Sequence, residues 1–343
     1  MARAAPRFWL RRCHPLALAL LPLALLFRAV TSVRRALYRH GVLASGSVGV
    51  PVVVVGNIAV GGSGKTPVVA WLVEALRAHG LVPGVISRGY GRTEIDVRLV
   101  TATDDAASVG DEPCMLFREL AVPLAVGADR LAACAALRAA HPEVDVIVSD
   151  DGLQHYRLRR DCEIVVVDEA VLGNGWPLPA GPLREGRGRL AEVALVIAHG
   201  PLGTRTQAVL ERAGVPTATM TLVGDELEHL VDAGRRQPLR ALAGRRVHAV
   251  AGIGRPQRFF AQLVAAGLDV VPHPFPDHHH YQPADFVALG DAPILLTRKD
   301  AVKCHDFAPP DSWVLPVRAR IDETAFGHVA RRLAGRTVEN AET

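Results

Sequence analysis

The residues best suited to chemistry form a glycine-rich segment in the first quarter of the chain. Four consecutive valines at positions 52–55 are followed by Gly61-Gly62-Ser63-Gly64-Lys65-Thr66, and then by an apolar run typical of a helix, residues 67–76. In a strand, loop and helix of this kind, backbone N–H groups bind phosphate oxygens, the lysine reaches the β- and γ-phosphates, and the threonine hydroxyl binds Mg²⁺. The alternative is an ordinary strand–helix turn that contains a chance Gly-Lys-Thr.

The segment departs from the G-x-x-x-x-G-K-[ST] motif at one position, because Ala59 stands where the motif has its first glycine. Strand, loop and helix nevertheless follow in the order that phosphate binding needs. We therefore predict a nucleoside triphosphate site. The residues predicted to bind the nucleotide here are Ala59, Val60, Gly61, Gly62, Ser63, Gly64, Lys65 and Thr66.

Two carboxylates follow another buried strand, which the apolar pattern predicts over residues 144–148. Asp150 and Asp151 come where the carboxyl end of this strand would face the phosphates, as in a Walker B element. We predict that they hold Mg²⁺ together with Thr66. The alternative is a strand-end Asp-Gly turn. The polar residues 154–156 continue the loop and are expected to shape the site.

Asp111 opens a helix predicted over residues 112–120, and from sequence alone it has two interpretations. It is either a helix cap or a general base that takes a proton from an attacking hydroxyl. Three consecutive histidines, His278, His279 and His280, lie far downstream. They suggest a metal site, yet no partner cluster follows at ligand spacing. A histidine that supports a catalytic carboxylate is an equally physical interpretation.

Further charged residues lie in a Gly/Pro-rich stretch and in two loops. Arg184 is placed to meet phosphate and Glu185 to assist Mg²⁺, and the alternative for both is an ion pair between domains. The loop at residues 87–92 and the segment 297–300 add cationic groups. The order Thr-Arg-Lys-Asp in the latter is not that of the guanine-reading motif, which argues against a GTPase.

Strands and helices alternate along most of the chain, which predicts an α/β fold with a parallel, doubly wound sheet. Right-handed crossovers would place all the carboxyl ends of the strands, and the loops above, on one edge. The predicted strands are 52–55, 82–86, 97–100, 122–126, 144–148, 163–167, 194–197, 217–222, 247–251, 293–297 and 313–321. The predicted helices are 67–76, 112–120, 129–140, 206–213, 257–266 and 322–333.

Composition and length fit a globular protein of two domains. The 343 residues are 49% hydrophobic and 22% charged, and the formal net charge of +4 is too small to indicate nucleic acid. Five cysteines without C-x-x-C spacing favour a reducing compartment. We predict a basic, apolar, membrane-associating segment at 1–40, a nucleotide-binding domain at 41–172, a hinge at 173–190, and a smaller α/β domain at 191–343 whose last helix packs back on the first. No segment indicates an obligate protein partner.

The first forty residues combine an apolar run with arginines and contain no acidic residue. The run at 16–27 is shorter than the roughly 20 residues of a bilayer span and contains Pro22. Three interpretations stay open: a signal peptide, a helix of the soluble core, or a helix lying in the cytoplasmic leaflet. Arginines on both sides suit anionic headgroups and favour the last. They are Arg3, Arg7, Arg11, Arg12, Arg28, Arg34, Arg35 and Arg39.

Taken together and in this order, the motifs resemble those of the tetraacyldisaccharide 4′-kinases, the lipid A pathway kinases of Gram-negative bacteria, over nearly the whole chain. They are the basic apolar N-terminus, Gly56-Asn57, 61–67, 87–91, 110–113, 150–155, 179–185, Asp277-His278 and 299–303.

The resemblance implies transfer of the γ-phosphate of ATP to the 4′-hydroxyl of a tetraacyldisaccharide 1-phosphate, giving lipid IVA at the cytoplasmic face of the inner membrane. It implies two α/β/α domains joined by a hinge, with ATP between them and an N-terminal membrane-associated helix. It further implies a base–histidine pair at Asp111 and His278, metal carboxylates at Asp150 and Asp151, and a hinge Arg-Glu at residues 184–185. A rival hypothesis is a P-loop ATPase switch that controls membrane docking and phosphorylates nothing.

Overall fold

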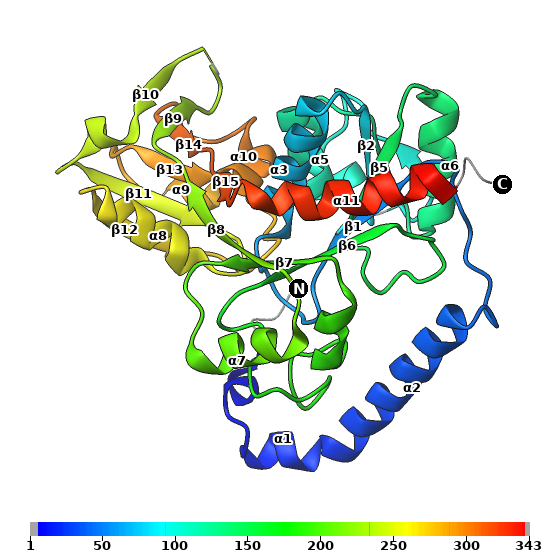
Figure 1. Cartoon of the computed structure of the whole chain (residues 1–343). Helices are drawn as coiled ribbons and strands as arrows, with labels where there is room; N and C mark the ends of the chain where they lie inside the picture. Colours follow the sequence, from blue (N-terminus) through cyan, green and yellow to red (C-terminus); the bar gives the residue numbers. More distant parts are fainter. Residues whose placement is uncertain (1–5, 93, 233, 288, 340–343) are drawn as a thin grey trace.

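Nine strands form the larger of two sheets in this computed structural model, which describes residues 6–339 apart from residues 93, 233 and 288 (Figure 1). In spatial order they are β15 (Arg318–Ile321), β8 (Thr217–Val223), β7 (Leu195–His199), β6 (Cys162–Val167), β1 (Val52–Gly56), β5 (Val146–Asp150), β2 (Pro83–Ser87), β4 (Leu124–Val126) and β3 (Arg98–Leu99). Neighbours pair in parallel except for β15 and β3, which are antiparallel edge strands. The predicted α/β fold with a mainly parallel sheet is confirmed.

The valine run of β1 explains why this strand lies near the centre of the sheet. Val53 and Val55 pack into an apolar cluster on one face, and Val52 and Val54 pack into a second cluster on the other. Alternate side chains of a strand point to opposite faces, so a strand without polar positions is buried on both. The first face is covered by α3 (Lys65–Ala78), α4 (Ala106–Val109), α5 (Asp111–Leu120) and α11 (Thr324–Glu339), and the second by α6 (Arg130–Ala140), η2 (Arg187–Glu192) and α7 (Thr204–Ala213).

The smaller sheet has its own apolar core on each face. Its strands in spatial order are β10 (Arg236–Pro238), β9 (Glu226–His229), β14 (Ser312–Leu315), β13 (Ile294–Thr297), β11 (Arg246–Ala251) and β12 (Asp269–Pro274). The helices around it are η3 (Leu239–Leu242), α8 (Pro256–Ala265), α9 (Ala284–Val287) and α10 (Arg298–Cys304). The strands β11 to β14 pair in parallel, whereas β9 and β10 are antiparallel.

The prediction that a separate unit begins at residue 191 is wrong for the strands that follow. The strands predicted over 194–197 and 217–222 are β7 and β8, and both extend the large sheet. Hydrophobic patterns locate a strand but do not identify its neighbour, and β7 pairs with the strand that precedes it in the chain. The last helix, α11, contacts β6, β7 and β8 of the large sheet.

Residues 173–190 do not form the predicted hinge between the two sheets, because they connect β6 and β7, which are neighbours in the large sheet. The chain passes between the sheets from β8 to β9 and again from β14 to β15. A Cβ on Gly224 would lie 2.4 Å from the carbonyl oxygen of Pro316, so the two connections run side by side. The second connection divides the strand predicted over 313–321, since Pro316 has no N–H to continue a ladder.

The N-terminal helices project from the large-sheet body at the bottom of Figure 1. They are η1 (Arg7–Leu10), α1 (Pro15–Ala19) and α2 (Leu21–Arg39). Pro22 lies in the first turn of α2, where a missing N–H costs no helical hydrogen bond. Within the described residues, no helix is both long and apolar enough to cross a membrane.

Candidate active site

The strand ends of both sheets face one another across the candidate site. The large sheet contributes the loop after β1 and the residues following β5 and β6, and the small sheet contributes those following β11, β12 and β13. A Cβ on Gly254 would lie only 3.5 Å from the backbone nitrogen of Gly62, so loops of the two sheets touch here. Parallel α/β sheets bind their ligands at the carboxyl ends of their strands.

The glycine-rich loop has the backbone geometry that phosphate binding requires. It ends at Gly64, whose φ of 92° favours glycine, and α3 begins at Lys65. Ala59 does not have a positive φ and forms a bridge with Leu183, so an alanine is compatible with this position. The N–H of Val60 donates to the carbonyl oxygen of Pro182 at 2.9 Å. Ala59 and Val60 therefore attach the loop to the 182–183 segment. Residues 62–66 of the loop line the cavity and are accessible to a nucleotide.

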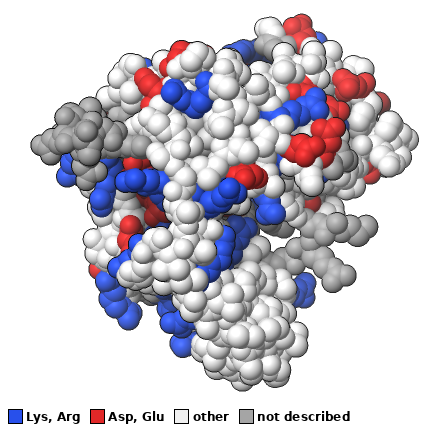
Figure 2. Space-filling view, turned by 90° about the vertical axis from the view of Figure 1, so that its right-hand side faces the viewer, with Lys and Arg blue, Asp and Glu red and all other residues white. Residues whose placement is uncertain are grey.

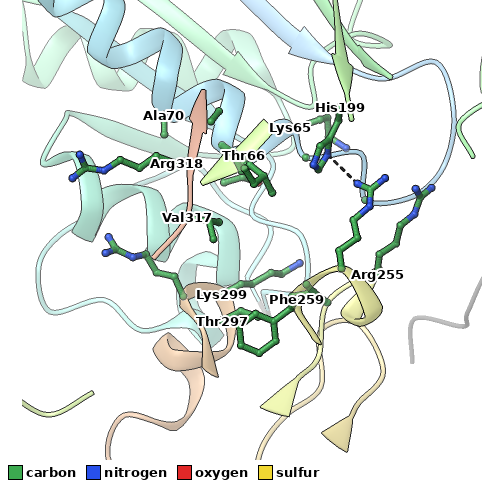
Figure 3. A pocket seen from close by; sticks show the side chains of 18 of the residues that line it. Lys65, Thr66, Ala70, His199, Arg255, Phe259, Thr297, Lys299, Val317 and Arg318 are labelled. Carbon is green, nitrogen blue, oxygen red and sulfur yellow. Dashed lines mark hydrogen bonds between the residues drawn. The ribbon is translucent and has the colours of Figure 1, made fainter. Parts of the chain in front are cut away.

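A cavity of about 600 Å³ lies beside this loop, between the two sheets (Figure 3). Residues 62–66 line one part of it, and Phe259 of α8 and Val317 line another. Cavities of several hundred Å³ accommodate small-molecule ligands and cofactors. This one combines the helix N-terminus and cationic groups that suit a triphosphate with apolar surfaces that suit a base.

Asp151 brings two of the predicted nucleotide-binding residues together. The Nζ atom of Lys65 lies 3.6 Å from Oδ1 of Asp151, and a guanidinium nitrogen of Arg184 lies 3.2 Å from Oδ2. Burial would raise the pKa of Asp151, but the charges of Lys65 and Arg184 outweigh it and hold this pKa below its ordinary value. Both cations are therefore positioned at the end of β5, next to the glycine-rich loop.

Asp150 is the other carboxylate at this strand end, and it is 1% exposed. Its Oδ2 accepts a long hydrogen bond of 3.4 Å from Ser87, and its Oδ1 has no hydrogen-bond partner among the described residues. Burial, together with the charges of Glu112 and Asp151, raises the pKa of Asp150 to about 7. A buried, unpartnered carboxylate oxygen fits a bound cation, which would supply the compensating charge.

The donor set points to a metal that is bound together with the nucleotide. In the described part of the chain, no group of three or more His, Cys, Asp or Glu side chains is arranged to hold a metal ion. Mg²⁺ in nucleotide sites is commonly held by one or two carboxylates and by phosphate oxygens. Asp150, Asp151 and the hydroxyl of Thr66 fit that arrangement.

Replacing Asp150 by asparagine is expected to stabilise the nucleotide-free protein at alkaline pH. The folded state keeps the Asp150 proton up to about pH 7, whereas the unfolded chain releases it near the ordinary value of 3.8. Between these values the folded state binds more protons, so the free energy of unfolding falls as the pH rises. The melting temperature of Asp150→Asn should exceed the parent's at pH 8, by a margin that shrinks toward pH 5. An equal difference at both pH values would contradict the raised pKa.

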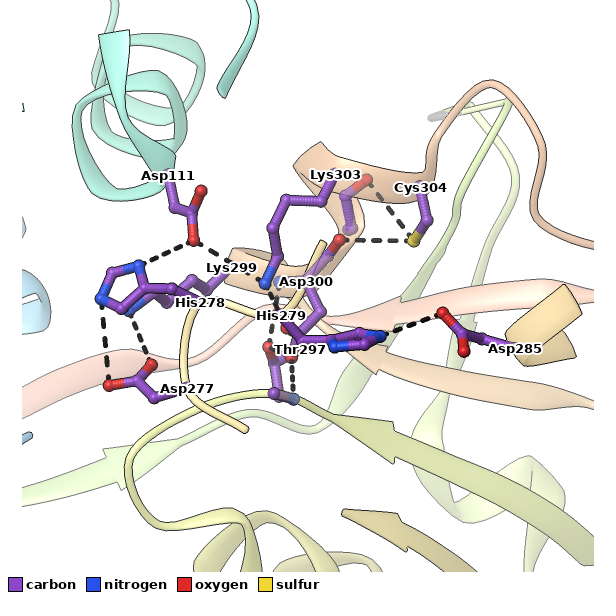
Figure 4. A network of polar contacts seen from close by, with 12 residues as sticks. Asp111, Asp277, His278, His279, Asp285, Thr297, Lys299, Asp300, Lys303 and Cys304 are labelled. Carbon is purple, nitrogen blue, oxygen red and sulfur yellow. Dashed lines mark hydrogen bonds and ion pairs between the residues drawn. The ribbon is translucent and has the colours of Figure 1, made fainter. Parts of the chain in front are cut away.

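Asp111 and His278 meet across the two sheets, as Figure 4 shows. Asp111 is the first residue of α5, His278 follows β12, and Nδ1 of His278 lies 3.0 Å from Oδ2 of Asp111. The N-cap of α5 is Gly110, and no side-chain capping bond forms there. The Asp111 carboxylate is thus directed to the histidine and not to the N–H groups of its own helix. This geometry disfavours the capping interpretation.

Two lysines of α10 add positive charge around this pair. The Nζ atom of Lys303 lies 3.7 Å from Oδ2 of Asp111, and that of Lys299 lies 3.1 Å from Glu112 and 3.4 Å from Nε2 of His278. Burial would raise the pKa of Asp111, but the hydrogen bond to His278 and the two lysines outweigh it and lower this pKa. Asp111 is therefore ionised at neutral pH.

Lys65, Lys299 and Lys303 are the only lysines in the sequence, and all three lie at this site. Sequence motifs predict the role of Lys65 and the cationic segment around Lys299, but they give Lys303 no role of its own. The spacing of four residues between Lys299 and Lys303 could have indicated a shared role, because it places both lysines on one face of a helix.

The other histidines of the triple-histidine segment lie outside this pair. Nε2 of His279 contacts Oδ2 of Asp285 at 3.0 Å, and His280 is exposed. The metal hypothesis for the three histidines finds no support among the described residues. His278 is the histidine that contacts Asp111.

The Glu185 side chain, predicted to assist Mg²⁺, contacts protein groups through both of its oxygens. Its Oε1 accepts a hydrogen bond of 2.7 Å from Gln154, and its Oε2 accepts one of 2.5 Å from Tyr156 and lies 3.3 Å from Arg189. Both oxygens are occupied by protein groups, and the side chain is buried. The ion-pair alternative describes this environment, although the pair is formed within the large-sheet body and not between domains.

Asp168, directly after β6, belongs to no motif that predicts a site residue. It is fully buried, and its Oδ2 lies 2.6 Å from Arg255 and 3.4 Å from Arg258. Arg258 also contacts Nδ1 of His199 at 3.0 Å. Both arginines belong to the small-sheet unit and line the cavity, so they connect the two units beside the nucleotide site. The position of Asp168 directly after a buried strand could have indicated that it belongs to the site.

Comparisons with known proteins find one family over nearly the whole chain. The profile of the tetraacyldisaccharide-1-P 4′-kinase (LpxK) family matches residues 16–334. The chain is 57% identical over 329 residues to the tetraacyldisaccharide 4′-kinase of Azoarcus sp. (strain BH72), covering 96% of this chain and 95% of the relative. It is 54% identical over 333 residues to that of Aromatoleum aromaticum, covering 97% and 98%.

A solved structure shows the same fold. The "apo" form of LpxK from Aquifex aeolicus, in complex with ATP, superposes with a TM-score of 0.76 at 26% sequence identity, covering 93% of this chain and 99% of that one. The profile and the relatives span nearly the whole chain. The chain therefore belongs to the tetraacyldisaccharide 4′-kinase family, and it is an ATP-dependent kinase of lipid A biosynthesis.

Proposed function

We propose that this kinase uses Asp111 as the general base that activates the 4′-hydroxyl of a tetraacyldisaccharide 1-phosphate for attack on the γ-phosphate of ATP. The observation that carries the proposal is the 3.0 Å contact between Asp111 and His278. It joins residues of the two sheets next to a cavity that the glycine-rich loop lines. A general base must lie within hydrogen-bond reach of the proton it takes, and this edge is where hydroxyl and phosphate would meet.

The cationic and backbone groups around the glycine-rich loop act on the phosphates. Lys65, Arg184 and the N–H groups of residues 61–66 orient the triphosphate and oppose the charge of a loose, in-line transfer. Asp150, Asp151 and Thr66 hold Mg²⁺, which neutralises phosphate charge when it is bound. The Oδ1 atom of Asp150, which has no hydrogen-bond partner among the described residues, supports this assignment.

Asp111 and His278 act as a unit on the acceptor. The low pKa of Asp111 keeps its carboxylate charged, so it accepts the proton as the hydroxyl oxygen forms its bond to phosphorus. His278 contacts Oδ2 and fixes the orientation of the carboxylate, and Oδ1 takes the proton. Lys303 opposes the charge of the same carboxylate.

The rival hypothesis, an ATPase switch without a phosphate acceptor, is tested with labelled nucleotide. The protein is incubated with γ-labelled ATP, Mg²⁺ and a tetraacyldisaccharide 1-phosphate in detergent micelles, and label is followed in lipid and in free phosphate. We expect label in the lipid, and a rate of labelling at least about 100-fold lower when Asp111 is replaced by alanine. Label only in free phosphate would support the switch.

We also propose that α1 and α2 lie in the cytoplasmic leaflet of the inner membrane. Leu26, Val30 and Val33 follow one another on one face of α2 and are each about 60% exposed. Residues 6–39 contain basic but no acidic side chains. The lowest part of the molecule in Figure 2, where Figure 1 places these helices, is largely free of charged side chains at its tip, with basic side chains beside it. Such helices bind membranes through apolar burial and attraction to anionic lipids.

Removing residues 1–39 is expected to shift the protein from membranes to the soluble fraction. Apolar burial persists when salt screens charge, so high salt alone should release the full-length protein only partly. Sedimentation with vesicles of zwitterionic and anionic lipids measures this. A matched variant with Leu26, Val30 and Val33 changed to serine keeps every arginine and should also bind more weakly. An N-terminus cleaved from the mature protein would support the signal-peptide alternative instead.

A further inference from the structure

Helix α2 is attached to the body of the protein at its second half. Arg34 lies over the rings of Tyr38 and Tyr156, 5.6 and 5.7 Å from their centroids. It also donates a hydrogen bond of 3.4 Å to the backbone carbonyl of Gln154. Cation–π contacts of this kind hold a side chain without burying its charge. The helix is therefore fixed to the polar loop that follows Asp151.

The neighbouring Arg35 reaches a buried carboxylate. Its guanidinium pairs with Glu192 and lies 4.0 Å from Oε2 of Glu185. Glu185 is 7% exposed and is also held by Arg189 and by the Tyr156 hydroxyl. Removing one partner from such a cluster costs more than removing a surface ion pair, because the remaining charge stays buried.

From Glu185 the polar contacts continue to the phosphate-binding lysine. Gln154 donates to Oε1 of Glu185 at 2.7 Å and accepts from Arg184 at 3.3 Å through its own side-chain oxygen. Arg184 pairs with Asp151, and Asp151 lies 3.6 Å from Nζ of Lys65. The chain of contacts from α2 to Lys65 is thus unbroken within the described residues.

A second branch reaches the glycine-rich loop directly. The side-chain nitrogen of Gln154 also donates to the backbone carbonyl of Asn57 at 3.0 Å. Asn57 is buried, and its side chain accepts from the N–H of Ala59. Gln154 therefore contacts both the loop and the arginine that act on the phosphates.

We infer that Arg34 and Arg35 are positioning residues for phosphoryl transfer, which act from the N-terminal helix through Gln154 and Glu185 on Arg184 and Lys65. An in-line transfer depends on the placement of its cations, so a small displacement of Arg184 or Lys65 lowers the rate of the chemical step. The helix that carries the apolar face is in this way part of the active-site framework. The inference does not depend on membrane association, because every contact lies within the chain.

The test compares two glutamine variants that remove the same charge from the same helix. Arg35→Gln breaks the contact to Glu185, whereas Arg39→Gln changes an arginine on the exposed side of α2. Both are assayed with the full-length chain in nonionic detergent micelles, which offer no anionic headgroups. We expect Arg35→Gln to lower kcat about fivefold with little change in the KM for lipid, and Arg39→Gln to stay within about twofold of the parent.

Two further variants separate positioning from folding. Arg35→Lys keeps a charge near Glu185 and should restore part of kcat, with the melting temperature of each variant recorded alongside. The double variant Arg35→Gln with Gln154→Leu should be no slower than Gln154→Leu alone, because both cut the same chain of contacts.

Three outcomes would overturn the inference. They are unchanged kcat in Arg35→Gln, a loss that saturating lipid restores, and additive losses in the double variant. Unchanged kcat would remove any role for Arg35 in the chemical step. A loss restored by saturating lipid would show that Arg35 acts in lipid binding. Additive losses would show that Arg35 does not act through Gln154. Loss of lipid labelling in the parent protein would instead contradict the kinase proposal, so the two failures are distinguishable.

Discussion

Replacing Lys65 by alanine is expected to lower kcat by about 100-fold or more. The lysine begins α3, lines the cavity and contacts Asp151 at 3.6 Å, so its charge is available to the phosphates that gather negative charge during transfer. The fold should be retained, because Lys65 stands at the first position of α3 and lines the cavity. Turnover of labelled lipid and thermal unfolding are measured together.

Lys65→Arg keeps the positive charge but changes its position, so this variant tests whether the position of the charge matters for the rate. A guanidinium is planar and longer than an ammonium group, so it does not reproduce a point charge at the β- and γ-phosphates. We expect this variant to keep the fold and to recover little of the lost rate. Near-normal turnover in Lys65→Ala would remove the assignment of residues 59–66 as the phosphate-binding loop.

Asp111→Ala is expected to reduce kcat by about 10²- to 10⁴-fold with little change in the KM for ATP. The reason is that a general base acts on the acceptor hydroxyl and contributes nothing to nucleotide binding. His278→Ala should have a similar effect, because it removes the 3.0 Å contact that orients the carboxylate. The double variant should be little worse than the worse single one if the two residues act as a unit.

His279→Ala is the matched control for this pair. His279 lies next to His278 in the chain but pairs with Asp285, so its removal should leave turnover close to that of the parent. A helix-capping role for Asp111 would instead lower thermal stability by about 1 kcal/mol with near-normal kcat. Full activity in Asp111→Ala, or additive losses in the double variant, would direct the search for the base to Asp150 or Asp151.

Local patterns predicted most of the secondary structure, and long-range pairing accounts for what they missed. The valines of β1 and the alternation of strands and helices gave the α/β fold, because burial on both faces leaves a continuous apolar run. The same patterns could not show that β7 and β8 extend the large sheet, nor that the chain turns from one sheet to the other at Pro316. Sheet membership depends on tertiary packing that no local window contains.

The same limit of local sequence patterns applies to single residues of the site. The glycine-rich motif predicts a loop that leads into a helix, and α3 begins at Lys65 directly after Gly64. Glu185 was assigned by its neighbour in the chain, yet the partners that determine its environment, Tyr156 and Gln154, are 29 and 31 residues away. Asp168 and its arginine partners come from different sheets, so their contact could be recognised only after folding.

The confinement of every lysine to the active site determines where amine-reactive reagents can modify the side chains of this kinase. An acylating reagent has no side-chain amine to modify other than those of Lys65, Lys299 and Lys303. Lys65 and Lys299 line the cavity, so bound nucleotide should shield them, and the extent of acylation would report cavity occupancy directly. Conversely, amine coupling to a sensor surface proceeds either through the α-amino group of the chain or through a lysine of the active site, and attachment through a lysine would block the site.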